Sequence, residues 1–315
     1  MKRSLEENFI KDLVDGKLKN LLEIIKKDST LDLQFRGKSI DVYYRGGKVL
    51  NLTSNANGYT AKIDKNYFKG EEITFDPKDI QAWIDKLPFI KQARDFHYSD
   101  EKNTAEREFQ QLIIRSNNYE RTSNSSDIFI TDMEYDFKVD SADKKKGQID
   151  LLGLEWHTNQ RSKNGLSTKF AFIEVKFGNN AVSGKSGLTD HLDDVKEYLT
   201  RYAQEYLELV KDTLEVFKQK RDLGLYRFGA NGNNNELDIS KVDIKPYFIV
   251  VLADYKNKDN NLYKLIEQID IEKYEEFFDL RFSISSFMGY GLYSDCLLNQ
   301  SEILKHIENI SNAKN

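Results

Sequence analysis

An acidic and a basic residue interrupt an apolar stretch near the middle of the chain. Residues 170–173 (FAFI) are all apolar, which predicts a strand covered on both faces, yet Glu174 and Lys176 follow directly. Side chains two residues apart along a strand point to the same face, so this carboxylate and this ammonium share one. Charges at such an apolar place cost free energy of desolvation unless they are paired or take part in chemistry. Glu174 and Lys176 are therefore candidate active-site residues.

A second carboxylate stands in the preceding apolar stretch. Asp150 lies within QIDLLGL (148–154), and the polar residues 158–168 would let the two stretches pair as antiparallel strands, with Asp150 beside Glu174 and Lys176. Two neighbouring carboxylates favour a cation between them, and oxygen ligands suit Mg²⁺ or Mn²⁺. A nearby lysine can orient or deprotonate a metal-bound water. The pattern predicts metal-assisted hydrolysis of a phosphodiester bond; the structural alternative is a salt bridge from Lys176 to either carboxylate.

The elements that must position these residues form a layered pattern in the second part of the chain. We expect strands at 128–135, 148–156, 169–177, 247–255 and 281–287, and helices at 104–116, 189–222, 261–268 and 301–310. The order of a helix, three strands, a long helix and a strand predicts a mixed α/β fold of the α+β kind. Three tyrosines of the long helix, Tyr198, Tyr202 and Tyr206, recur every fourth residue and are expected to face the core.

The first hundred residues predict a smaller unit of helices and hairpins. A helix is expected at 4–28, followed by short alternating strands and a further helix that begins near Ile80. The strands are expected at 31–35, 40–44, 49–53 and 59–63. The sequence RGGK at 45–48 is typical of a hairpin turn. A polar stretch then suggests two parts, an N-terminal accessory region at 1–100 and a catalytic domain at 101–315.

The spacing of Asp150 and Glu174-Val175-Lys176, on consecutive strands after a glutamate-bearing helix, resembles the PD-(D/E)XK nuclease superfamily. The resemblance covers about residues 104–200. It implies a restriction-endonuclease-like core of the order αβββαβ and a Mg²⁺-dependent nuclease. In this family the aspartate and the glutamate bind the ion, which implies Asp150 and Glu174 as ligands with the Val175 carbonyl as a third. The lysine, here Lys176, acts on the attacking water.

The helices on either side of these strands match the family less closely. The first helix of the family often supplies another glutamate near the metal, and the resemblance gives that role to Glu106, or to Glu108. Many members carry Gln-x-x-x-Tyr on the helix that follows the lysine strand. This chain has Asp194-x-x-x-Tyr198 there, with His191 one turn earlier. His191 is therefore a residue to examine near the site, and a surface or capping role is its alternative.

Basic residues near the site could contact phosphates. The segment 138–185 carries nine basic and five acidic residues, in a chain whose net charge is −5. We expect contacts with nucleic acid from Lys185 and from the run Lys144, Lys145 and Lys146; solvated loops are the alternative. Residues 178–186 also approximate a phosphate-binding loop of NTPases, but five residues separate their glycines instead of four. An NTPase is thus a weaker hypothesis, and a nuclease-like fold that binds nucleic acid or protein without cutting is the main alternative.

The composition of the chain excludes several further classes of protein. The chain has 315 residues and one cysteine, Cys296, which excludes a disulfide framework and a multi-cysteine zinc site. No stretch reaches the roughly 18 to 20 apolar residues of a membrane span, and the N-terminus lacks the apolar core of a secretory signal. We therefore expect a cytoplasmic protein without a membrane partner. The resemblance implies DNA as the substrate, in a defence, restriction or repair setting, and a homodimer would suit cuts on both strands.

Overall fold

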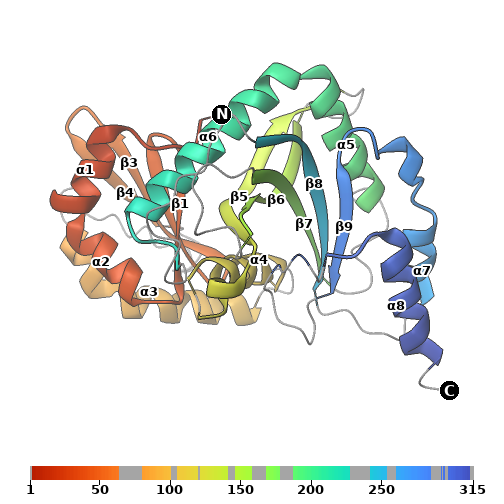
Figure 1. Cartoon of the computed structure of the whole chain (residues 1–315). Helices are drawn as coiled ribbons and strands as arrows, with labels where there is room; N and C mark the ends of the chain where they lie inside the picture. The colour runs from red at the N-terminus through yellow and green to blue at the C-terminus, as the bar shows by residue number, and fades with distance from the viewer. Residues whose placement is uncertain are drawn as a thin grey trace. The chain divides into compact units, whose positions relative to one another are not determined.

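The computed structural model describes residues 2–63, 80–100, 105–119, 121–140, 146–157, 168–177, 187–227, 242–253, 260–284, 292, 294 and 297–312. The chain is a mixed α/β protein with two sheets and, within these ranges, eight α-helices. It divides into two compact units. The N-terminal unit comprises Lys2–Arg121 and Glu215–Arg227, and the C-terminal unit comprises Thr122–Leu214 and Phe228–Asn315. Figure 1 traces the first sheet in red to orange and the second from yellow-green to blue.

The N-terminal unit is built on an antiparallel sheet of the order β1-β2-β3-β4. Its elements are α1 (Glu7–Asp15), α2 (Lys19–Lys27), β1 (Leu31–Phe35), β2 (Ser39–Tyr44), β3 (Gly47–Asn55), β4 (Gly58–Lys62), α3 (Ile80–Asp100) and α4 (Ala105–Asn118). The predicted hairpin between β2 and β3 is confirmed. Arg45 and Gly46 both have positive φ, 48° and 68°, as a two-residue type I′ turn requires.

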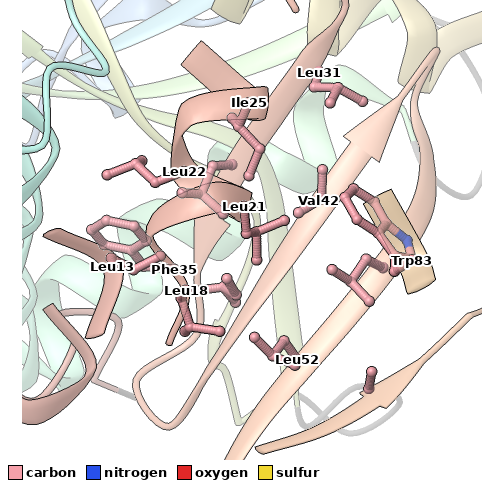
Figure 2. Close-up of a cluster of buried hydrophobic side chains, with 14 of the residues drawn as sticks. Leu13, Leu18, Leu21, Leu22, Ile25, Leu31, Phe35, Val42, Leu52 and Trp83 are labelled. Carbon is pink, nitrogen blue, oxygen red and sulfur yellow. The ribbon is translucent and has the colours of Figure 1, made fainter. Parts of the chain in front are cut away.

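One apolar core holds this unit together. Figure 2 shows leucines and isoleucines of α1 and α2 lying against the strands, with the indole of Trp83 from α3 on the same cluster. Trp83 is fully buried, and its Nε1 donates to the carbonyl oxygen of Val49 at 3.2 Å. Val216 and Leu223, far along the chain, belong to the same core. This explains why residues 215–227 fold with the N-terminal unit.

The C-terminal unit is built on a mixed sheet of the order β5-β6-β7-β8-β9. Its elements are β5 (Ile128–Lys138), β6 (Lys146–Glu155), β7 (Thr168–Phe177), α5 (Leu188–Arg201), the first part of α6 (Ala203–Asp222), β8 (Val242–Ala253), α7 (Asn260–Glu267), β9 (Asp279–Ile284) and α8 (Gln300–Asn312). The first three strands are antiparallel, whereas β7, β8 and β9 are parallel. A parallel pair needs a long connection, and the segment with α5 and α6 joins β7 to β8. Figure 1 shows α7 and α8 together beside β9.

Aromatic side chains attach α5 to β5 and the start of α6 to β7. Tyr206 packs on Phe170 and Phe172 at ring-centroid distances of 5.8 and 6.1 Å, and Tyr198 packs on Phe137 at 5.0 Å. Tyr198 and Tyr206 are buried, as predicted from their spacing. Burial raises the pKa of both phenols, which therefore stay neutral. The same face of β7 carries Glu174 two residues after Phe172.

Three expectations need correction. The helix expected at 4–28 is two helices, because the chain turns at Gly16, where a Cβ atom would lie 2.7 Å from the Cα of Asp12. The single helix expected at 189–222 is also two, since Tyr202 leaves helical geometry with φ −121° and ψ 37°. The division between the units follows residue 121 instead of residue 100, and α4 folds with the N-terminal unit.

Candidate active site

The candidate catalytic residues lie where β6 and β7 stop pairing. The antiparallel ladder between these strands ends at the pair Leu151–Ile173. Beyond that pair, β6 stays paired with β5 and β7 stays paired with β8, so the two strands diverge. The predicted antiparallel pairing is confirmed, and the next residues along the two strands are Asp150 and Glu174. We call this place the β6–β7 fork.

The side chain of Asp150 connects β6 to β7 at the fork. Its Oδ2 accepts a hydrogen bond from the backbone amide of Val175 at 2.7 Å. An amide at that position in a continued ladder would donate to the backbone of β6. Here the carboxylate of Asp150 replaces the backbone acceptor, so its charge lies directly beside the Glu174-Val175-Lys176 segment. The structure thus brings together the aspartate and the segment that the sequence analysis selected.

Glu174 and Lys176 form a buried ion pair on β7. The two residues are 2% and 5% exposed, and Lys176 Nζ lies 2.7 Å from Glu174 Oε1. The same oxygen lies 3.1 Å from Nε2 of His191, which comes from the second turn of α5. His191 had been selected only for its place in the chain. Its imidazole reaches the site from α5, one turn before Asp194.

The chemistry of the donors at the fork suits a hard cation. Asp150 and Glu174 offer carboxylate oxygens, and Val175 offers a backbone carbonyl oxygen, the ligand types that Mg²⁺ and Mn²⁺ prefer. In the described part of the chain, no group of three or more His, Cys, Asp or Glu side chains is arranged to hold a metal ion. Mg²⁺ commonly uses one or two carboxylates and completes its shell with water, so two carboxylates are compatible with such a site.

A strained residue stands opposite Asp150 on β5. The pairs Met133–Leu151 and Tyr135–Ile149 flank Glu134, which places it across from Asp150. Glu134 has a φ of 57°, in the left-handed region that residues with a Cβ rarely adopt. Such strain costs on the order of 1–3 kcal/mol and is concentrated at functional sites. The sequence carried no signal for it, since neither glycine nor asparagine marks the position.

The two helix glutamates lie on α4 in the N-terminal unit. Glu108 binds Arg45 of the β2–β3 turn, with Oε1 2.8 Å from Nε. This hydrogen bond raises the pKa of Arg45, although burial opposes it. On the next turn, Gln111 accepts a hydrogen bond from the Gly46 amide at 2.6 Å. Glu108 thus helps to attach α4 to its own sheet, Glu106 is half-buried on the first turn, and the metal role of either stays a prediction.

Most of the predicted phosphate contacts cannot be placed. Lys144, Lys145, Lys185 and the loop at 178–186 lie outside the described residues. Lys146 is the first residue of β6, is exposed, and forms an ion pair with Asp136 of β5. Its role in nucleic-acid binding stays a prediction.

The comparisons with known proteins leave the family open. No family model, no curated protein and no solved structure compared with this chain matches it. Within the described residues, no helix has the length and apolar character needed to span a membrane.

Proposed function

We propose that the protein is a Mg²⁺-dependent nuclease that hydrolyses phosphodiester bonds in DNA. The observation that carries this proposal is the fork itself, where Asp150 binds the Val175 amide beside the buried Glu174–Lys176 pair. The order β5, β6, β7, α5–α6, β8 supports the βββαβ part of the restriction-endonuclease-like core that the resemblance implies, whereas α4, which would be its first helix, folds with the N-terminal unit. DNA as the substrate, a defence or repair setting and a homodimer follow from the resemblance alone and belong to the proposal.

Burial of the ion pair favours chemistry over a structural role. Taking two charges out of water costs several kcal/mol for each ion, and well-packed apolar residues would stabilise a strand at least as well. Here the charges interrupt a strand whose other residues, Phe170 to Ile173, are all buried.

Each residue has a role that follows from its contacts. Asp150 and Glu174, with the Val175 carbonyl, would hold the ion, which supplies Lewis acidity toward a phosphate oxygen. Lys176 then keeps a positive charge near the attacking water and assists loss of its proton. His191 contacts the same oxygen of Glu174 as Lys176 does, so it orients that carboxylate from α5. A cation held by Glu174 would compete with Lys176 and His191 for Oε1, so one of these two contacts would weaken.

One observation favours the alternative, a nuclease-like module that binds without cutting. Glu174 Oε1 already contacts the side-chain nitrogens of both Lys176 and His191, which is the arrangement expected of a carboxylate with a purely structural role. The two functions differ in one measurable property, since only the nuclease needs a divalent ion at the fork.

The test is cleavage of plasmid and linear DNA in Mg²⁺, Mn²⁺ or EDTA. Asp150→Asn keeps an acceptor for the Val175 amide but lacks the charge that a cation needs, and Lys176→Ala removes the ammonium. We expect each to reduce cleavage by about 10²-fold or more, the scale of a lost acid–base or charge-stabilising group. Lys169→Ala is the matched control, because Lys169 is a buried lysine at the other end of β7. Cleavage that persists in EDTA or in Asp150→Asn would exclude the proposed site.

A further inference from the structure

A cavity of 430 Å³ lies within the N-terminal unit and belongs to no part of the nuclease proposal. Its walls come from α2, β1, the end of α4 and the segment that follows α6. The lining residues are Ile25, Lys26, Lys27, Ser29, Leu31, Asp32, Leu33, Asn118, Tyr119, Lys220, Gly224, Leu225, Tyr226 and Arg227. Small-molecule sites typically measure about 300–1,000 Å³, so this cavity has the size of a ligand site.

The charge of the lining is strongly positive. The lining contains one carboxylate, that of Asp32, and four cationic side chains, those of Lys26, Lys27, Lys220 and Arg227. Lys26, Lys27 and Arg227 are exposed, whereas Lys220 is 2% exposed. A concave site lined by one sign of charge concentrates ligands of the opposite sign. The excess of cationic side chains therefore favours an anionic ligand, although Lys26 also lies 3.6 Å from Glu23 outside the lining.

The one carboxylate is held inside a preorganised polar network. Tyr119 donates to Asp32 Oδ1 at 2.7 Å, and Gln34 donates to Oδ2 at 2.6 Å. Lys220 Nζ in turn donates to Gln34 Oε1 at 3.0 Å. Burial, together with the charge of Asp32, raises the pKa of Tyr119 well above its usual value, so the phenol remains a donor. Gln34 thus links the buried ammonium to the carboxylate, and Lys220 remains part of the cavity wall.

The remaining wall is apolar and partly aromatic. Ile25, Leu31, Leu33 and Leu225 line it together with the ring of Tyr226, which stacks on Phe217 at 5.1 Å. Figure 2 shows Ile25 and Leu31 at one edge of the core cluster, so this wall is an extension of a rigid core. An apolar wall suits a flat ring, and a basic rim suits a phosphate.

We propose that this cavity binds a mononucleotide, with its phosphate among Lys27, Arg227 and Lys220 and its base against Leu33 and Tyr226. The recognition elements are the charge of the rim and the area of the apolar wall. The ligand therefore needs both a phosphate and a ring, and neither inorganic phosphate nor a nucleoside meets both requirements.

The test is calorimetric titration of the full chain with AMP, ATP, adenosine and inorganic phosphate. We expect AMP or ATP to bind at least about tenfold more tightly than adenosine or inorganic phosphate, since tenfold corresponds to ~1.4 kcal/mol. In the double variant Lys27→Glu/Arg227→Glu the Kd should rise by at least about tenfold. Both positions are exposed, so these substitutions leave the core intact. Lys17→Glu, an exposed lysine outside the lining, should bind like the wild type.

Several outcomes would overturn this assignment. Absence of binding by either nucleotide up to millimolar concentration would remove the site. Equal affinity for AMP and adenosine would show that the basic rim does not contribute to binding. Equal affinity for AMP and inorganic phosphate would show that the apolar wall does not contribute. Loss of binding in Lys176→Ala with full binding in the double variant would place the nucleotide at the fork instead.

Discussion

Asp32 of the N-terminal unit and Glu174 of the C-terminal unit are two buried carboxylates whose partners are arranged in opposite ways. In the N-terminal unit, neutral donors occupy both oxygens of Asp32, and Gln34 stands between that carboxylate and Lys220. In the C-terminal unit, Lys176 contacts the carboxylate of Glu174 directly, and His191 reaches the same oxygen. The first arrangement distributes its hydrogen bonds, whereas the second concentrates two nitrogen partners on one atom.

This difference indicates different tasks. A carboxylate with each oxygen occupied by a neutral donor has little to gain from a cation, and its network stays the same when a ligand arrives. Under the nuclease proposal, the carboxylate of Glu174 would exchange one of its two nitrogen partners, Lys176 or His191, for a divalent ion. The network around Asp32 would therefore stay unchanged in the proposed nucleotide cavity, whereas the proposed nuclease would need the contacts of Glu174 to change when its ion binds.

The two units can be followed separately because each contains one tryptophan. Trp83 lies in the N-terminal unit and Trp156 in the C-terminal unit, and both are buried. Fluorescence-detected urea unfolding in a Trp156→Phe background reports the first unit, and a Trp83→Phe background reports the second. For a substitution in one unit, the tryptophan of that unit measures the effect and the tryptophan of the other unit serves as the control.

The largest stability effect is expected at the fork. Glu174→Gln leaves the ammonium of Lys176 buried without its carboxylate, which should lower the free energy of unfolding by about 3–5 kcal/mol. The double variant Glu174→Gln/Lys176→Met buries no charge and should recover most of that loss, although it is expected to be inactive. A double variant as unstable as Glu174→Gln alone would contradict a direct charge pair. Trp83 should report little change in any of these variants.

A smaller effect is expected in the N-terminal network. Tyr119→Phe removes one hydroxyl and leaves Asp32 with its Gln34 contact, so the free energy of unfolding should fall by about 1–3 kcal/mol. The loss is limited because the charge of Asp32 keeps a hydrogen-bond donor. If this variant were destabilised as much as Glu174→Gln, the contrast between a distributed and a concentrated network would fail. Trp156 should be unaffected.

The strands were more predictable than the boundaries of larger elements. Alternation and apolar runs located the nine strands that lie within the described residues, because a side-chain period of two is a local property. The breaks at Gly16 and Tyr202 were not predicted. The helix before each break and the helix after it both have apolar residues at helical spacing, so the pattern reads as one continuous helix. The assignment of 215–227 to the N-terminal unit depends on contacts of Val216 and Leu223 with residues some two hundred positions away, which periodicity does not encode.

The candidate site shows the same limit. Glu174 and Lys176 were visible as charges in an apolar run, and Asp150 followed from the expected pairing of neighbouring strands. The contact between His191 and Glu174 depends on how α5 packs over the sheet, so the sequence could only indicate its vicinity. The residue type of Glu134 gives no signal of its left-handed φ, and the cavity of the N-terminal unit is formed by three stretches, 25–33, 118–119 and 220–227, that are distant along the chain.

The smallest effect tests whether direct ion pairs of the C-terminal sheet behave alike away from the fork. Lys169, on β7, lies 3.1 Å from Asp243 and also binds Asp279, which Lys245 contacts at 2.7 Å. Burial alone would raise the pKa of Asp279, but hydrogen bonds from Lys169 and Lys245 outweigh it and lower the pKa below 3.8. A carboxyl whose pKa is lower in the folded chain stabilises folding above its unfolded pKa, and that contribution disappears as the pH falls through the folded value.

Asp279→Asn should therefore reduce the free energy of unfolding at pH 7 by less than either substitution described above, because Asp279 is partly exposed. The difference from the wild type should shrink as the pH is lowered below about 4, where the unfolded wild-type carboxyl begins to be protonated. Urea titrations at pH 7, 4 and 3, followed through Trp156, measure this. A difference that stays constant with pH would mean that Asp279 stabilises the sheet through packing alone. Of these two pairs in the C-terminal sheet, direct pairing would then stabilise folding only at the fork, where both partners are buried.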